Sequence, residues 1–201
     1  MMPRVAGYVL RTHLCLRWQL RRWRTDQSGV TAVEFALVAM PFIMLLFGTL
    51  SVCLFFFTNF TMENAVWQAS RGIRTGQFQQ GQGGYAGAAS AEDRKKAFKT
   101  ALCAKAPAYI DCNKVVVFVQ SNSGGFGSIT RPVCATDGTM VDQSQAEFNA
   151  GGASSVVLIT ACYPWSFGGR LPFIALNTLS DGSLLIQASV AFRTEPFPSS
   201  N

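Results

Sequence analysis

The chain has 201 residues, enough for one modest domain and a further segment, and its formal net charge is +6. Charged residues make up 14% of it, against about 25% in soluble domains, and the mean hydropathy of +0.21 excludes an intrinsically disordered or acidic solvating chain. The excess positive charge lies in residues 1–29, where six Arg and one Asp give a net of +5, while the other 172 residues carry 11 basic and 10 acidic side chains, a net of +1.

This uneven charge bears on the partners that the chain can have. A nucleic-acid-binding domain carries its basic residues on a folded face, and residues 30–201 do not offer such an excess. We therefore expect no nucleic-acid partner. The basic leader of residues 1–29 instead suits the cytoplasmic flank of a membrane segment, because Arg-rich flanks stay on the cytoplasmic side.

A long apolar run follows the leader. No charged residue occurs from Phe35 to Met62, a run of 28 residues between Glu34 and Glu63, and about 20 helical residues cross the hydrocarbon of a bilayer. The 15 Phe, Leu, Ile and Val residues at positions 35–60 favour insertion by roughly 4 to 9 kcal/mol, more than one Glu costs. A buried helix of a soluble protein is one alternative. A secretory signal peptide fits poorly, because the run is long and no small-x-small cleavage site follows it.

The boundary between the leader and the apolar run carries a motif. Gly29 is followed five positions later by Glu34 and then by Phe35, which resembles the processing site of type IV prepilins. In that class a membrane-embedded aspartyl peptidase, the prepilin peptidase, cuts after the Gly. The resemblance implies a cut between Gly29 and Val30 that removes the leader, and a glycine lets a protease approach the backbone closely.

Such a cut would give Val30 a free amine. Positions i and i+4 of a helix share a face, so the ammonium group would neighbour the carboxylate of Glu34, within one subunit or between subunits. Pairing would offset much of the cost of a carboxylate at the membrane edge. The alternative interpretation is that Glu34 only favours the positive N-terminal end of a helix near the headgroups.

A wider segment resembles a named family. The stretch from Gly29 to Gly76 contains the sequence Ala-Val-Glu-Phe-Ala-Leu, then Pro41, and an Ala-rich tail with two Arg. These features resemble the TadE-like family of tight-adherence (Tad/Flp) pilus assembly. The C-terminal sequence Ala-Phe-Arg-Thr-Glu-Pro-Phe, residues 191–197, also resembles such proteins.

The resemblance implies a minor pseudopilin of the bacterial inner membrane. Its partners would be membrane lipid, the prepilin peptidase, and other pilin, pseudopilin and Tad assembly subunits. The N-terminus would be cytoplasmic and the residues from about 64 onward periplasmic. A TadG-like relative can remain uncleaved, so the alternative is a single-pass anchor that displays a disulfide-bonded periplasmic head for binding or adhesion.

The helix is expected to continue past the bilayer, over about residues 26–75. Apolar side chains recur along one of its faces at helical spacing: Met62, Ala65, Ala69 and Ile73. Gly76 is suited to end the helix, and the Gly- and Gln-rich residues 76–90 predict a linker. Ser90 and Asp93 form a capping-box pattern before a short helix that runs to about Lys105.

Three strands are expected in the remaining residues. They are the Val-rich residues 114–120, the β-branched residues 155–163, and residues 184–193, whose alternation suits an antiparallel strand with one wet face. Gly- and Ser-rich residues 121–128 and 149–154, and residues 164–172, predict loops. We therefore expect an α+β fold, in which a long pilin-like transmembrane helix precedes a small head (residues 91–201) with one helix on a three- or four-stranded antiparallel sheet.

Four cysteines fall in the expected periplasmic part: Cys103, Cys112, Cys134 and Cys162. In an oxidising compartment four cysteines suggest two disulfides with three possible pairings, and we favour Cys103–Cys112 with Cys134–Cys162. The competing reading, a metal site, lacks a C-x-x-C pair and an exported His. Cys53 lies in the apolar run and Cys15 in the leader.

Catalysis is not expected. The single His, His13, lies in the leader, so a mature chain would hold no Ser-His-Asp or Cys-His arrangement. No spacing singles out a carboxylate pair among the remaining acids: Asp111, Asp137, Asp142, Glu147 and Asp181. We expect no enzyme, no cofactor and no metal. Four aromatic residues in loop-like contexts are candidates for a binding surface: Phe126, Trp165, Phe167 and Phe197.

Overall fold

The computed structural model describes residues 29–88, 90–167 and 177–198. The chain divides into two compact units, Met1–Phe47 and Gly48–Asn201. Most of the predicted leader, residues 1–28, lies outside the described residues, and so do residues 168–176 of the connection between the second and third expected strands.

The first described element is helix α2, Val30–Arg74, which is 45 residues long and contains Pro41. By length and composition it is the one helix of the described residues that could cross a membrane, since its most apolar stretch has a mean hydropathy of 2.3. The helix ends one residue before the expected limit, and Gly76 follows it with a φ of 80°. That left-handed conformation favours glycine and is common just past a helix end.

The C-terminal part of α2 packs into the core of the second unit. The buried apolar side chains on this part of the helix are the predicted apolar face and, in addition, Val66: Met62, Ala65, Val66, Ala69 and Ile73. The segment after the helix also enters this core, because Phe78 and Tyr85 are buried there. The ring centroids of these two aromatic side chains lie 5.1 Å apart.

Helix α3, Ala91–Cys103, begins with the predicted capping box. The Asp93 backbone N–H donates to the Ser90 hydroxyl at 3.0 Å, and the Ser90 hydroxyl donates to the Asp93 carboxylate at 2.6 Å. Capping satisfies donors that the first helical turn leaves unpaired. Phe98 and Leu102 face the core and are fully buried.

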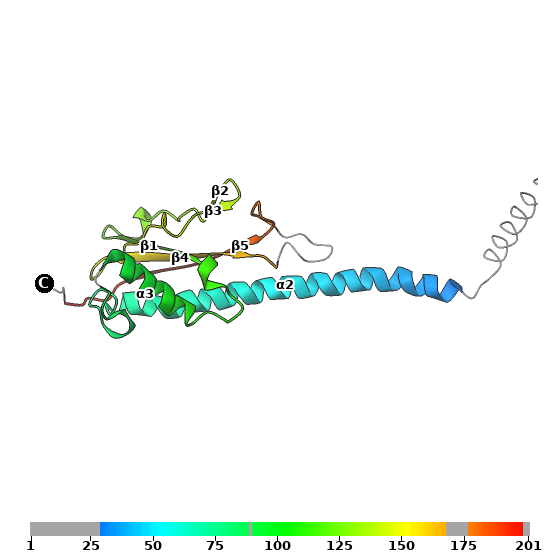
Figure 1. The fold of residues 1–201 in the computed structure, drawn as a ribbon, viewed down its shortest axis with the longest axis horizontal. Helices are drawn as coiled ribbons and strands as arrows, with labels where there is room; N and C mark the ends of the chain where they lie inside the picture. Colours follow the sequence, from blue (N-terminus) through cyan, green and yellow to red (C-terminus); the bar gives the residue numbers. More distant parts are fainter. Residues whose placement is uncertain (1–28, 89, 168–176, 199–201) are drawn as a thin grey trace, which may run out of the picture. The chain divides into compact units, whose positions relative to one another are not determined.

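The sheet has three antiparallel strands in the order β1-β4-β5. They are β1, Val116–Asn122, β4, Val156–Trp165, and β5, Leu184–Arg193. Helix α3 and the C-terminal part of α2 lie against the sheet (Figure 1), and apolar residues of both helices share one core cluster with alternate residues of the strands. The α+β architecture is thus confirmed, with the end of α2 as a second helix on the sheet.

Both limits of β1 and of β4 differ from the predicted ranges, by one or two residues. β1 starts two residues late, because Cys112–Lys114 forms a 3-10 turn in which the Asn113 N–H donates to the Asp111 carboxylate at 3.1 Å. β4 runs through Pro164, which we expected in a loop. The β1 pairing ends at Cys162, so the amide hydrogen that Pro164 lacks has no β1 partner there.

The other face of the sheet carries a smaller cluster: Val116, Phe118, Cys134, Ala146 and Cys162. A hairpin that we did not predict contributes to this side. Its strands are β2, Ala135–Thr136, and β3, Thr139–Met140. Asp137 and Gly138 join them with φ of 51° and 74°, the two successive positive values of a type I′ turn.

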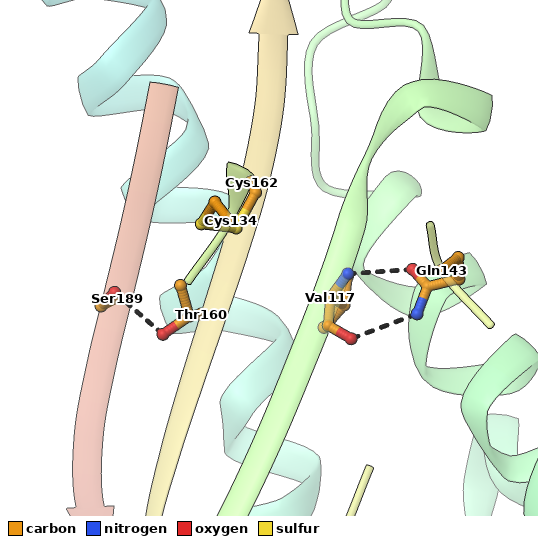
Figure 2. The surroundings of a disulfide bond; sticks show 6 residues. All are labelled: Val117, Cys134, Gln143, Thr160, Cys162 and Ser189. Carbon is orange, nitrogen blue, oxygen red and sulfur yellow. Dashed lines mark hydrogen bonds between the residues drawn. A yellow bond between two sulfur atoms is a disulfide. The ribbon is translucent and has the colours of Figure 1, made fainter. Parts of the chain in front are cut away.

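Residues 143–149 cover the outer edge of β1. The side-chain amide of Gln143 accepts a hydrogen bond from the Val117 N–H at 2.9 Å and donates one to the Val117 carbonyl at 3.2 Å (Figure 2). Further along, the Val119 N–H donates to the Glu147 carbonyl and the Asn149 N–H donates to the Val119 carbonyl. The edge N–H and carbonyl groups of Val117 and Val119 are therefore paired without a full fourth strand.

Candidate processing site and assembly helix

The predicted cleavage position lies at the start of α2. Val30 is the first helical residue, and Gly29, directly before it, is exposed. A Cβ atom placed on Gly29 would meet no atom within 4 Å. Packing within the described fold therefore does not require glycine at this position, and a cut after Gly29 would leave every residue of α2 in place.

The residues that follow this bond are exposed. Val30 is 49% exposed and Phe35 is 74% exposed, and Glu34 is also exposed. Val30 and Glu34 are separated by four residues, about 6 Å along the axis, and so share a face of the helix. The first residue of α2 thus lies one helical turn from the exposed carboxylate of Glu34.

Apart from Glu34 and two Thr residues, the surface of α2 from Val30 to Leu50 is apolar. Its exposed large apolar side chains include Leu37, Val38, Phe42 and Ile43, and 6% of the most apolar stretch is buried. A helix that is apolar all round is buried in a protein core or spans a membrane. This one has no protein core around it among the described residues.

Residues 29–71 match the family model described as "TadE-like protein". No curated protein and no solved structure matches this chain. The TadE-like segment begins at the predicted cleavage residue and ends three residues before α2 does.

The TadE-like match and the apolar helix together support a membrane protein related to the Tad pilus. The helix fits a protein with a single membrane crossing near its N-terminus. The residues that follow Arg71, which include the whole sheet, lie outside the match.

The second stretch that resembles such proteins, residues 191–197, meets the end of the TadE-like helix. The Glu195 N–H donates to the Arg74 carbonyl at 2.9 Å, and the Arg74 Nε lies 3.4 Å from the Glu195 carboxylate. A Cβ on Gly76 would lie 2.5 Å from the ring of Phe197. The two segments are therefore neighbours in the fold, although 116 residues separate Arg74 from Ala191 and the prediction did not pair them.

Two disulfides hold the head together. Cys103 at the end of α3 joins Cys112, and Cys134 joins Cys162 of β4 (Figure 2). These are the two pairs that we favoured. Cys53 is free and exposed, and Cys15 lies outside the described residues.

The acidic residues that we considered for catalysis are dispersed and serve local structure. Asp142 accepts hydrogen bonds from the N–H and hydroxyl of Ser144, and Asp181 does the same with Ser183. These bonds hold the pKa of both carboxyls below the usual range, the Ser144 backbone bond acting most strongly on Asp142 and the Ser183 hydroxyl on Asp181. Within the described ranges, no three His, Cys, Asp or Glu side chains gather in a way that could hold a metal ion.

The four aromatic residues proposed for a binding surface differ in exposure. Phe126 and Phe167 are exposed, and Phe197 is half-buried. Trp165 is the last residue of β4 and is buried, so its assignment to an exposed loop was wrong. The strand continues two residues further than its β-branched run indicated, and this places the indole against α2, 6.1 Å from the Phe55 ring.

Proposed function

We propose that this chain is a TadE-like minor pseudopilin that helps to assemble a Tad/Flp-type pilus at the bacterial inner membrane. The observation that carries the proposal is the start of α2: the helix begins at Val30, directly after Gly29, and its first 20 residues are mostly apolar and exposed, with Glu34 as the one charged residue among them. A prepilin peptidase would cut after Gly29 and release an intact helix whose first residue bears the new amine.

The helix would act by lateral association in the membrane. Helix packing there relies on close van der Waals contact and on the few polar groups present. Glu34 is the one charged residue between Val30 and Met62, so an unpaired carboxylate at this position would oppose burial between subunits. The Val30 amine of the same subunit or of a neighbouring one would pair with it and set the axial position of the helices.

The head would lie in the periplasm and contact other assembly subunits. The positive leader favours a cytoplasmic N-terminus, and two disulfides are typical of an oxidising compartment. We propose a structural part for the protein in this assembly, and no reaction.

Mass spectrometry of the intact protein tests the cleavage. The full chain is purified from cells with and without the peptidase, together with the Gly29→Leu variant. We expect a chain that begins at Val30 only for the natural sequence in the presence of the peptidase. A chain that keeps Met1 or Met2 in the presence of a working peptidase would contradict processing and favour the uncleaved anchor.

The role of Glu34 is tested by a pair of neutral variants on the same helix. Glu34→Gln removes the proposed partner of the amine, whereas Glu63→Gln removes an exposed carboxylate at the other end of the apolar run. We expect both proteins to insert, and only Glu34→Gln to reduce the yield of pili. Equal yields from the two variants would contradict the pairing.

A further inference from the structure

One end of the head carries a cluster of aromatic side chains beside α2. We call it the aromatic end; its residues are Phe55, Phe57, Tyr109, Trp165 and Phe167. The ring centroids of Phe57 and Tyr109 lie 6.3 Å apart, and those of Trp165 and Phe167 lie 5.8 Å apart. The hydroxyls of Tyr109 and Thr61 form a hydrogen bond of 2.9 Å. Three separate segments thus meet here: α2, the loop after α3, and the end of β4.

The aromatic end is open to its surroundings. Phe57, Tyr109 and Phe167 are 57%, 50% and 48% exposed. Beside them lies a groove of about 440 Å³ whose lining is uncharged: Leu54, Phe57, Thr58, Tyr109, Tyr163, Trp165, Ser166 and Phe167. Large exposed apolar patches with polar groups at their margin mark contacts with a partner or a membrane.

The position of the aromatic end along α2 identifies what covers it. Counted from Phe35, about 20 helical residues cross the hydrocarbon, and the twentieth is Leu54, the first residue of the groove lining. The next charged residue, Glu63, stands about 9 Å beyond Phe57 along the helix axis. The groove therefore occupies the short uncharged interval between the end of the apolar span and the first charged turn.

The residue types also fit this position. Tyr and Trp concentrate at the membrane–water interface, because each combines an apolar ring with a polar group. Tyr109 has this character, and the Thr58, Ser166 and Tyr163 hydroxyls provide further polar groups at the groove. The Cys103–Cys112 disulfide closes the loop that holds Tyr109, which limits how far this side chain can move away from α2.

We infer that the aromatic end rests in the headgroup region of the outer leaflet, with phospholipid filling the groove. This inference depends on the proposed insertion of α2 into the membrane, which supplies the bilayer at this level. The head then sits directly on the membrane surface through its Tyr109 and Phe167 side chains. A tethered head separated from the bilayer by water is a different arrangement and makes different predictions.

Spin labels of known depth test the inference with the full chain in vesicles of phosphatidylcholine and phosphatidylglycerol. Cys15→Ser and Cys53→Ser remove the free thiols, and single labels are placed by Phe167→Cys, Tyr109→Cys and Phe126→Cys. Phe126 is the matched control: it is 59% exposed and follows β1, whose last residue pairs with the first residue of β4, at the far end of the sheet from Trp165.

For each label we measure the ratio of its collision rate with oxygen to its collision rate with a water-soluble nickel complex. We expect this ratio to be severalfold higher at positions 167 and 109 than at position 126. Equal ratios at the three positions would overturn the inference. A high ratio that falls when the protein is diluted in lipid would also overturn the inference, because a second copy of the chain, and not lipid, would then shield the labels from the nickel complex.

A fourth label separates this inference from the insertion on which it depends. Leu37 lies in the apolar span and is exposed, so Leu37→Cys should report a depth within the hydrocarbon. An aqueous label at position 37 would contradict membrane insertion itself. A deep label at position 37 with an aqueous one at position 167 would contradict only the membrane contact of the head. Both results are read after non-reducing electrophoresis has shown that the two disulfides are formed.

Discussion

Gln143 pairs with both backbone groups of Val117 as a neighbouring strand would do (Figure 2). One side chain thereby satisfies the N–H and the carbonyl of Val117 at the edge of β1, and the Val117 side chain is buried. The pairing needs an amide, because the same group must accept at one atom and donate at the other.

Replacement of Gln143 by Leu should destabilise the head by about 2 kcal/mol, since two hydrogen bonds of about 1 kcal/mol each are lost. Gln143→Glu should also destabilise it, because a carboxylate can accept from the Val117 N–H but repels the Val117 carbonyl. Urea unfolding of the full chain in detergent, followed by near-ultraviolet circular dichroism, measures both. Gln145→Leu, at an exposed position two residues on, is the control, and a loss as large as that of Gln143→Leu would contradict the role of the amide.

Gly72→Ala should destabilise the head although alanine favours helices. A Cβ at position 72 would lie 2.6 Å from the Tyr85 hydroxyl oxygen and 2.7 Å from its Cε2 atom. Overpacking of this kind costs about 1 to 3 kcal/mol, against a gain of about 1 kcal/mol in helix propensity.

The same urea unfolding measurement shows whether Gly72→Ala lowers or raises the free energy of unfolding. Gly84→Ala is the matched control, because a Cβ there meets no atom within 4 Å. In a double-mutant cycle, Tyr85→Leu should reduce the cost of Gly72→Ala. If Gly72→Ala stabilises the head, the close contact with Tyr85 does not limit packing at this point.

Removal of either disulfide should lower the stability of the head. By the loop-entropy relation, the Cys103–Cys112 link contributes about 3 kcal/mol and the Cys134–Cys162 link, which closes a longer loop, about 4 kcal/mol. Thermal unfolding of the paired Cys→Ser variants measures the difference. Cys53→Ser, which removes the exposed free thiol, should leave the unfolding temperature unchanged. A larger loss for the shorter loop would show that contacts, and not loop closure, dominate.

Acid should weaken the head through three carboxyls. Hydrogen bonds from a nearby serine hold the pKa of Asp93, Asp142 and Asp181 below the usual range. Their contribution to stability is fully present above the ordinary Asp pKa of about 3.9 and is lost as the pH falls through the lower values of the folded state.

The free energy of unfolding should therefore decrease as the pH is lowered below about 4. The triple variant Asp93→Asn, Asp142→Asn, Asp181→Asn should show a flatter dependence, as measured by urea titrations at a series of pH values. Asp137→Asn, at the hairpin turn, controls for the loss of a charge. An unchanged slope in the triple variant would assign acid sensitivity to other groups.

The elements with strong local signals were predictable from the sequence. β5 has the predicted limits, because its alternation of apolar and polar residues continues over its whole length. The capping box of Ser90 and Asp93 also matches its local pattern. The long helix was predictable from the same apolar run that produced the family resemblance.

The parts that depend on distant partners were not predictable. Gln143 has no local feature that indicates a partner in β1, 26 residues earlier. Phe78 and Tyr85 lie among Gly and Gln residues that predict a linker, yet the core that buries them is built from α2, α3 and the sheet. The Asp137-Gly138 pair was a usable hairpin signal, but the two-residue strands beside it are too short to show a period.

The oxidation state of the four head cysteines would report the orientation of each molecule in the membrane. A thiol pair oxidises after it has left the reducing cytoplasm, whereas the bond after Gly29 would be cut at the cytoplasmic edge of the membrane. In the Cys15→Ser, Cys53→Ser variant, which lacks the free thiols, a molecule inserted the wrong way round would keep its head thiols reduced, and these thiols would react with a maleimide reagent. Electrophoresis after such labelling would count correctly oriented molecules in intact cells, without any fusion tag that could disturb the helix.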